Sequence, residues 1–206
     1  MTEQAAMIVV GSTHTGSLGR VRPGATGERL LNGAPCAIAV VPDGYRSGER
    51  DVAGAIGVAY DGSKEASAAA HAAAGIAHAL GTRLEVIGVL APDPAYGGGE
   101  LMGGSADPAM REVLRGDLKK VLEAALPASV DANRVVLDGD PAGRLIERSS
   151  NLGVLVIGSR GYGPLRAVLV GGVSGRVVRA AQCPVIVTPR GVEAPLRGLF
   201  DAIADP

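Results

Sequence analysis

Short apolar runs alternate with longer amphipathic stretches along most of this chain, and their spacing predicts its secondary structure. The runs predict buried β-strands at residues 55–60, 83–90, 134–137, 154–157 and 185–188. Helical spacing or alanine density predicts helices over residues 64–80, 110–125 and 173–181. Because apolar strands alternate with helices and close on a strand, we expect a doubly wound parallel five-stranded sheet with helices on both faces.

Turn and cap residues indicate where these elements begin. A turn at residues 61–63 ends in Ser63, the predicted N-cap of the helix that follows. Asp140 followed by Pro141 predicts the start of a further short helix. Residues 92–104 contain two prolines and five glycines, which predicts a long loop between the second strand and the next helix.

An internal repeat organises the chain. Residues 7–42 align without a gap onto residues 154–189, and twelve of the 36 aligned positions are identical, among them several glycines and both cysteines. The repeat divides the chain into four segments. Residues 1–42 are a partial copy that has only the last strand, helix and strand. Residues 43–54 form a polar linker, residues 55–190 are a complete copy, and residues 191–206 are an unassigned tail.

The first copy is too short to enclose a hydrophobic core by itself. We therefore expect it to dock on the complete copy or on a second chain, with strand Ile38–Val41 beside Val185–Thr188 or its symmetry mate. It carries His14 where the complete copy has Gly161, and it has no first strand of its own. For these reasons we do not expect it to hold a ligand.

A glycine-rich stretch, residues 158–174, links the strand at 154–157 to the helix after it. Its spacing is Gly158, two residues, Gly161, nine residues and Gly171. Glycines let backbone amides approach an anion, and a helix N-terminus adds partial positive charge, so the stretch predicts a phosphate cradle. It lacks the lysine of a P-loop. The alternative interpretation is a structural turn that binds nothing.

Composition and charge exclude several classes of partner. The formal net charge is -1 and aromatic residues make up 2 %, so neither phosphate neutralisation nor base stacking points to a nucleic acid, and no anionic membrane is expected. No apolar segment reaches the roughly 18 residues of a membrane span, and the first residues do not resemble a signal peptide. A cytoplasmic location is therefore expected.

Two cysteines and two histidines could suggest redox or metal chemistry, but a structural interpretation suits all four better. Cys36 and Cys183 lie far apart without a CxxC pattern, and each precedes an apolar run, so both are interpreted as buried small hydrophobes. His71 and His78 share a helix face without Cys, Asp or Glu at ligand spacing, so they are interpreted as solvated or packed. We predict no metal site and identify no catalytic residue.

Residues 55–190 resemble a universal stress protein domain. The resemblance rests on the segment AYDGS at 59–63, on the glycine-rich stretch, and on the ending QCPVIVTP at 182–189. Residues 2–42 resemble the last third of a second such domain, so the chain is similar to the tandem type. The resemblance implies an adenine nucleotide alpha hydrolase-like fold, dimerisation through the last strand, and, in one subclass, ATP binding through G-x2-G-x9-G-[S/T].

Carried onto this chain, the resemblance implies that Asp61 and the backbone near Val89 meet adenine and ribose, and that the glycine-rich stretch lines the phosphates. The implied binding residues are Ala59, Asp61, Val89, Ile157, Gly158, Arg160, Gly161, Gly171, Gly172, Val173 and Ser174. Gly172 departs from the motif, which has Ser or Thr there. Loss of that hydroxyl should weaken binding by roughly 1.5 to 3 kcal/mol, of which a backbone amide from Gly172 or the guanidinium of Arg160 would recover part.

Three functions follow from these observations. The leading one is a cytoplasmic universal stress protein that binds ATP or a related nucleotide (AMP, ADP or cAMP), with or without Mg²⁺, and acts through dimerisation and regulation. The second is a stress-response interaction protein that needs no nucleotide, which Gly172 favours. A slow ATPase ranks third because no general base can be named.

Overall fold

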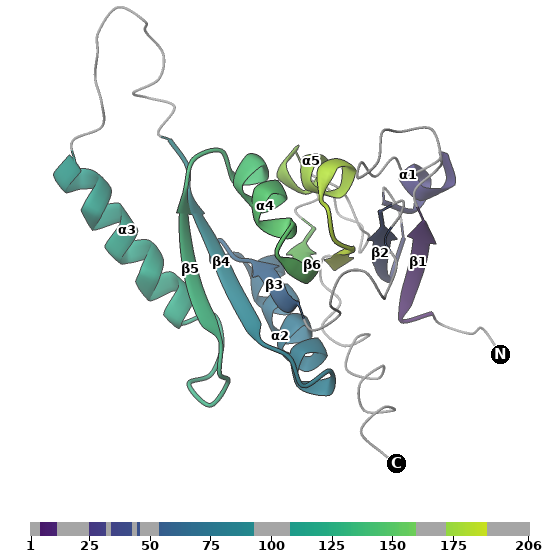
Figure 1. Cartoon of the computed structure of the whole chain (residues 1–206), viewed down its shortest axis with the longest axis horizontal. Coiled ribbons are helices and arrows are strands. Elements are labelled where there is room, and N and C mark those ends of the chain that lie inside the picture. The colour runs from purple at the N-terminus through teal and green to yellow at the C-terminus, as the bar shows by residue number, and fades with distance from the viewer. Residues whose placement is uncertain are drawn as a thin grey trace, which may run out of the picture.

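The computed structural model describes residues 5–11, 25–31, 34–42, 45, 54–92, 108–159 and 172–188. These contain seven strands and five helices, arranged as a sheet between two helical layers (Figure 1). The strands are β1 (Met7–Gly11), β2 (Ala37–Val41), β3 (Ala55–Ala59), β4 (Leu84–Leu90), β5 (Asn133–Asp138), β6 (Leu152–Gly158) and β7 (Val185–Thr188). The helices are α1 (Ala25–Leu31), α2 (Lys64–Ala79), α3 (Pro108–Glu123), α4 (Pro141–Ser149) and α5 (Gly172–Ala180).

The five strands of the complete copy are parallel and lie in the order β7-β6-β3-β4-β5. The chain adds β4 and β5 on one side of β3 and then crosses back to place β6 and β7 on the other side. The strand order therefore reverses between β3 and β6, which is where doubly wound folds hold ligands. The predicted fold class is confirmed, and β7 has its predicted bounds.

Helices α2 and α3 pack on one face of this sheet, and α1, α4 and α5 pack on the other. Five of the six buried residues of α2 are alanines, so this helix lies close to the strands. Ser63 caps α2 as predicted, because its side-chain oxygen accepts a hydrogen bond from the Ala66 amide at 3.2 Å. Aliphatic side chains make up most of both cores, in line with the scarcity of aromatic residues, and Tyr60 is an aromatic member of the core on the α2 side.

The first copy forms β1, α1 and β2, and it joins the complete copy through an antiparallel pair of strands. Ile38 pairs with Val187 and Val40 with Val185, so the predicted pairing of these two strands is found within one chain. Tyr45, in the linker, donates its hydroxyl hydrogen to the Gly153 carbonyl at 3.1 Å. Strand β7 thus lies between β6 and β2 and has no free edge.

Helix α3 begins and ends two residues earlier than predicted, and its apolar residues are less buried than an amphipathic pattern leads one to expect. Leu122 is its one buried side chain, whereas Met110, Val113 and Leu114 are 55, 58 and 44 % exposed. Two arginines of its first turns contact Asp138, the last residue of β5. The first turns therefore lie at the end of the sheet, where no strand face is left to cover them.

Candidate functional site

The carboxyl ends of three neighbouring strands bring several predicted residues together. Ala59, at the end of β3, pairs with Ile87 of β4, and β6 ends on the other side of β3 at Gly158. Ala59 and Val89 are partly buried and Ile157 is buried, so these three contribute backbone and packing. Among the predicted site residues that the structure describes, Asp61, just beyond β3, is the one with a charged and exposed side chain.

Asp61 is held in place by a short turn. Its Oδ1 accepts a hydrogen bond from the Ser63 amide at 3.0 Å, and Gly62 between them has a φ of 81°, a conformation that favours glycine. The carboxylate thus begins the turn before α2 and also faces solvent. The turn role of Asp61 is confirmed, and its role in nucleotide binding stays a prediction that this turn permits, since one carboxylate can accept several hydrogen bonds.

Gly158 is required by packing rather than by backbone conformation. A Cβ added there would lie 2.6 Å from the Glu65 carbonyl oxygen and 3.0 Å from the Ala66 nitrogen. Gly158 does not have a positive φ, unlike Gly62, Gly81 and Gly139 among the described residues. The first turn of α2 therefore crosses directly over the end of β6, and this contact explains the glycine without any ligand.

Helix α5 carries the remaining described site residues. It begins at Gly172, where an added Cβ would meet nothing within 4 Å. Val173 is 44 % exposed, whereas Ser174 is only 8 % exposed and therefore faces the protein. Of the other predicted site residues, Arg160, Gly161 and Gly171 lie outside the described part of the chain, as does His14 of the first copy.

An ion pair that was not predicted links α4 to α5. The Arg176 guanidinium donates to both oxygens of Asp140 at 2.7 and 3.0 Å, while the Gly143 amide donates to the same carboxylate at 2.8 Å. The hydrogen bonds from Arg176 and then Gly143 hold the pKa of Asp140 below its ordinary value. The sequence indicated Asp140 as a helix cap only, because its partner is remote in sequence.

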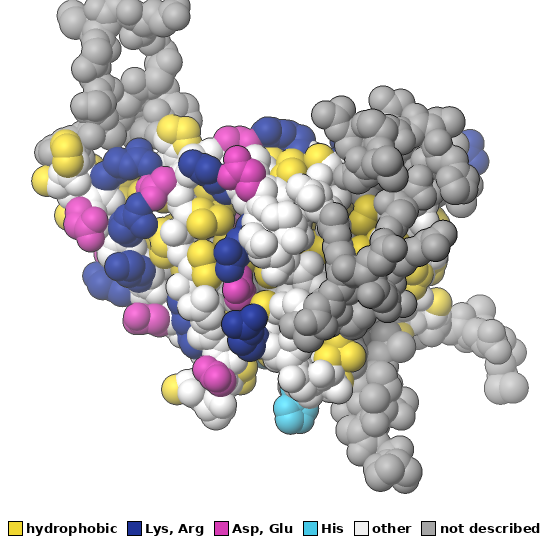
Figure 2. All heavy atoms as spheres, viewed as in Figure 1, with side chains coloured by type: hydrophobic (Ala, Val, Ile, Leu, Met, Phe, Trp, Pro, Cys, Tyr) yellow, Lys and Arg dark blue, Asp and Glu magenta, His cyan; other side chains and the backbone are white. Residues whose placement is uncertain are grey.

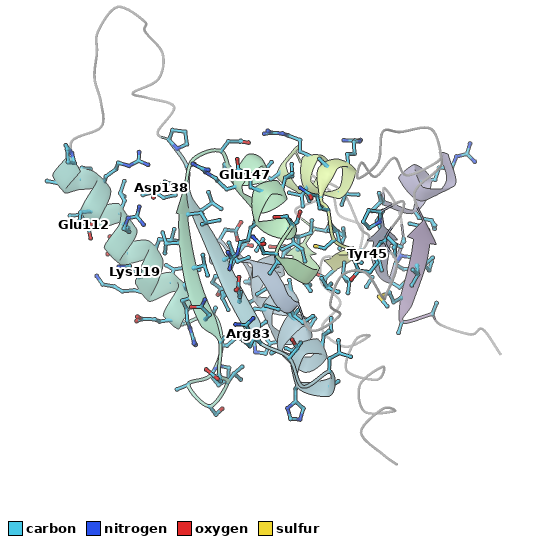
Figure 3. The ribbon with its side chains drawn as sticks, viewed as in Figure 1. Tyr45, Arg83, Glu112, Lys119, Asp138 and Glu147 are labelled. Atoms are coloured by element: carbon cyan, nitrogen blue, oxygen red, sulfur yellow. The ribbon has the colours of Figure 1, made fainter. Side chains whose placement is uncertain are left out.

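A second unpredicted cluster lies at the end of β5, where Arg111 and Arg115 of α3 both contact Asp138. Figure 3 shows Asp138 at this end of β5. The Arg111 guanidinium lies 2.8 Å from Oδ1 of Asp138. The Arg144 side chain of α4 donates a hydrogen bond to the backbone carbonyl of Asp138 at 2.6 Å. The hydrogen bond from Arg111, helped by the charge of Arg115, lowers the pKa of Asp138. A sequence signal could have predicted this cluster: two arginines stand four residues apart on one helix, and the strand after that helix ends in an aspartate.

This cluster predicts a pH dependence of stability. Because the pKa of Asp138 is lower in the folded chain than in the unfolded one, its stabilising effect is complete above about pH 4–5 and is lost as the pH falls through the folded-state pKa. The difference in free energy of unfolding between wild type and Asp138→Asn should therefore shrink from pH 5 towards pH 2, measured by urea denaturation. Arg111→Ala should flatten the profile in the same way. Parallel profiles for wild type and Asp138→Asn would contradict this.

A cleft of about 420 Å³ opens between β5 and α4, away from the predicted residues. It is lined by Val136, Leu137, Asp138, Arg144, Glu147, Arg148 and Asn151. Figure 2 shows basic and acidic side chains mixed over this side of the molecule. The lining charges are paired: Arg144 with Glu147 at 2.8 Å, and Arg148 with Glu85 of β4 through contacts of 2.7 to 3.0 Å. Ion pairs therefore neutralise the charged side chains that line the cleft.

Metal binding and membrane spanning find no support in the described residues. Within these ranges no three His, Cys, Asp or Glu side chains gather closely enough to hold a metal ion. None of the helices there has the length and apolar character needed to cross a bilayer. His71 and His78 are exposed on α2, and both cysteines are buried as free thiols, with burial raising the pKa of Cys36.

A doubly wound sheet with a site at its strand ends defines a broad class of α/β proteins, and comparison with known proteins narrows it. The model of the universal stress protein family matches residues 54–189, more than half of the chain. The chain belongs to the universal stress protein family.

Two relatives show how the chain compares in extent. A universal stress protein of Mycobacterium tuberculosis is 29 % identical over 196 residues, which are 91 % of this chain and 63 % of the relative. One from Thermus aquaticus is 31 % identical over 137 residues, which are 63 % of this chain and 94 % of the relative. The chain thus spans less than two thirds of the mycobacterial protein's length, and nearly all of the Thermus protein matches part of it.

Solved structures agree in fold. A universal stress protein from Archaeoglobus fulgidus has a TM-score of 0.58 at 23 % identity, over 92 % of this chain and 62 % of that one. A member of the family from Burkholderia pseudomallei has a TM-score of 0.51 at 24 % identity, over 68 % of this chain and 98 % of that one. At these identities the likeness concerns the fold alone.

Proposed function

We propose that this chain is a regulatory stress-response protein that binds ATP or a related adenine nucleotide at the carboxyl ends of β3 and β6. One observation carries the proposal: Asp61, fixed by its own turn and exposed, lies at the reversal of strand order in a universal stress protein domain. We propose binding without turnover, since no described group offers itself as a general base.

The described residues fit such a ligand. The Asp61 carboxylate has acceptor capacity left for ribose hydroxyl groups, and the end of β4 at Val89 offers backbone to a base. The first turn of α5, with open space at Gly172, offers backbone amides to a phosphate. The ligand supplies a polyphosphate anion, with or without Mg²⁺, and Arg160, Gly161 and Gly171 would complete the set implied by the family resemblance.

Calorimetric titration with ATP tests the proposal. We expect wild type to give saturable heat and Asp61→Ala to bind at least about tenfold more weakly, because an acceptor of charged character is lost. Asp61→Asn keeps an acceptor for the Ser63 amide and should separate loss of charge from loss of the turn. Asp117→Ala removes a carboxylate of similarly exposed character on α3 and should bind like wild type. Equal affinities for wild type and both Asp61 variants would contradict the proposal.

The second candidate is a stress-response interaction protein that needs no nucleotide. The packing of Gly158 against α2 favours it, since that glycine is explained without a ligand, and so does the missing hydroxyl at Gly172. In both candidates the pairing of β2 with β7 occupies the last strand within one chain. This second function would be favoured if titration with ATP gave no heat and the sedimentation profile of the protein were the same with and without ATP.

A further inference from the structure

The ion pair between Asp140 and Arg176 lies at the same edge of the sheet as the proposed nucleotide site. Asp140 caps α4 two residues beyond the end of β5, so the N-terminus of this helix lies at the carboxyl ends of the strands. Arg176 reaches Asp140 from α5, which packs beside α4 (Figure 1). The Arg176 guanidinium is therefore held at the carboxyl edge of the sheet, beside the N-terminus of α4.

Arg176 shares a helix face with the first residue of α5. Gly172 and Arg176 are four residues apart, and residues at this spacing lie one above the other on the same side of a helix. Helical side chains lean towards the N-terminus of their helix, so the Arg176 side chain extends back towards the first turn. Gly172 has no side chain to obstruct it, and nothing lies within 4 Å of a Cβ added there. This first turn is where the proposed function places phosphate groups.

The pair of Asp140 and Arg176 is exposed, so another anion can take the place of Asp140. The side chains of Arg176 and Asp140 are 58 and 51 % exposed, whereas those of Arg148 and Glu85 are 31 and 12 % exposed. Exposed ion pairs contribute little to stability, because water screens the charges. Arginine also binds two phosphate oxygens with the same fork of N–H groups that it offers to a carboxylate. Arg176 is therefore exchangeable, while Arg148 is a fixed partner of β4.

From these observations we infer that Arg176 binds a phosphate group of the nucleotide, and that Asp140 competes with the nucleotide for this arginine. The inference rests on the proposed function and adds to it a binding residue and a competitor that the family resemblance does not imply. When the nucleotide binds, the Arg176 guanidinium exchanges the carboxylate oxygens of Asp140 for phosphate oxygens. Asp140 keeps its hydrogen bond from the Gly143 amide, so α4 stays capped. Without nucleotide, Asp140 holds the cation that the phosphate needs.

The other arginines described near this edge of the sheet are placed differently. Two arginines of α3 and one of α4 are bound to Asp138 at the end of β5, and β5 is separated from β6 by two strands. Arg179 lies in the last turn of α5, at the opposite end of the helix from Gly172. Within the described part of the chain, Arg176 is therefore the arginine placed beside the first turn of α5.

Calorimetric titration of charge variants with ATP tests the inference, because the two members of the pair should act in opposite directions. Arg176→Gln should weaken ATP binding at least about tenfold, since a hydrogen bond to a charged phosphate is lost. Asp140→Asn should tighten ATP binding about two- to fivefold, since asparagine can still cap α4 but no longer competes for Arg176. The matched controls are Arg179→Gln on α5 and Asp117→Asn on α3, which remove the same charges elsewhere and should bind ATP like wild type.

Nuclear magnetic resonance of the Asp140 carboxyl carbon gives a second readout. The hydrogen bonds from Arg176 hold the pKa of this carboxyl below its ordinary value. Saturation with ATP should raise the pKa, because the guanidinium is withdrawn and negative charge arrives nearby. The rise should be larger in wild type than in Arg176→Gln, where no guanidinium can be withdrawn. An ion pair with a structural role alone would give equal changes in both proteins.

The outcomes separate this inference from the proposed function. If wild type binds ATP and Arg176→Gln binds it equally well, the inference is wrong and the proposed function stands. Equal losses in Arg176→Gln and Arg179→Gln, or weaker binding by Asp140→Asn than by wild type, would also overturn the inference. If wild type shows no saturable binding of ATP, both fail. Thermal unfolding of each variant separates loss of binding from loss of folding.

Discussion

Gly158→Ala is expected to lower the free energy of unfolding by about 2–3 kcal/mol, because overpacking in a closely packed contact costs that much. The new methyl group would lie 2.6 Å from the Glu65 carbonyl oxygen and 2.7 Å from its carbon. Both atoms belong to the backbone of α2, so relief requires the helix to shift on the sheet. For a chain of this size the melting temperature should fall by about 5–10 °C in differential scanning calorimetry.

Gly11→Ala is the matched control, because the same substitution at the repeat mate meets no atom within 4 Å. It should leave stability unchanged or raise it by about 0.5 kcal/mol, since alanine reduces the conformational freedom of the unfolded chain. If Gly158→Ala melted like Gly11→Ala, the close approach of α2 to the end of β6 would be wrong. Because α2 follows directly on the turn of Asp61, a shift of the helix should also weaken nucleotide binding.

The second large effect is a gain: Gly172→Ser should tighten ATP binding by roughly 10- to 100-fold. The substitution restores the hydroxyl group that the resemblance places at this position, and a hydrogen bond to a charged phosphate contributes roughly 1.5 to 3 kcal/mol. Space is available, since nothing lies within 4 Å of the new Cβ. Isothermal titration calorimetry measures the change.

The matched control is Gly116→Ser, at another uncrowded glycine, on α3. It should leave the affinity for ATP unchanged, while any gain in helix stability should be shared by both variants. An affinity of Gly172→Ser no better than that of wild type would show that the first turn of α5 does not meet the phosphates. If neither wild type nor Gly172→Ser bound ATP, the interaction protein would be the better description.

Much of the fold could be predicted because its signals are local. Ser63 and Asp140 act as N-caps where the sequence placed them, and β7 is bounded by the residues that its apolar run indicated. The pairing of β2 with β7 was also predictable, since a partial copy too small for a core must attach through the strands it has. Periodicity could not show how far α3 extends past the sheet, which is why Met110 and Val113 are exposed.

The candidate site was predictable at its strand ends but not in its packing. Asp61 lies at the end of β3 as expected, because a turn residue after a parallel strand must lie at that edge. The sequence allowed two interpretations of Gly158, as part of an anion-binding loop or of a structural turn. Its close approach to Glu65 is a tertiary contact, which no local sequence pattern encodes. The same holds for the pair of Asp140 and Arg176, whose members come from two helices.

The antiparallel junction between β2 and β7 also constrains how the chain is made. Residues 37–41 leave the ribosome well before their partner on β7, which is the last strand that the structure describes. Until β7 has been made, the described part of the chain offers β2 only β1 as a neighbouring strand. The junction between the two copies therefore forms late in synthesis, and the edge of β2 stays unpaired until then, which is a state that favours aggregation.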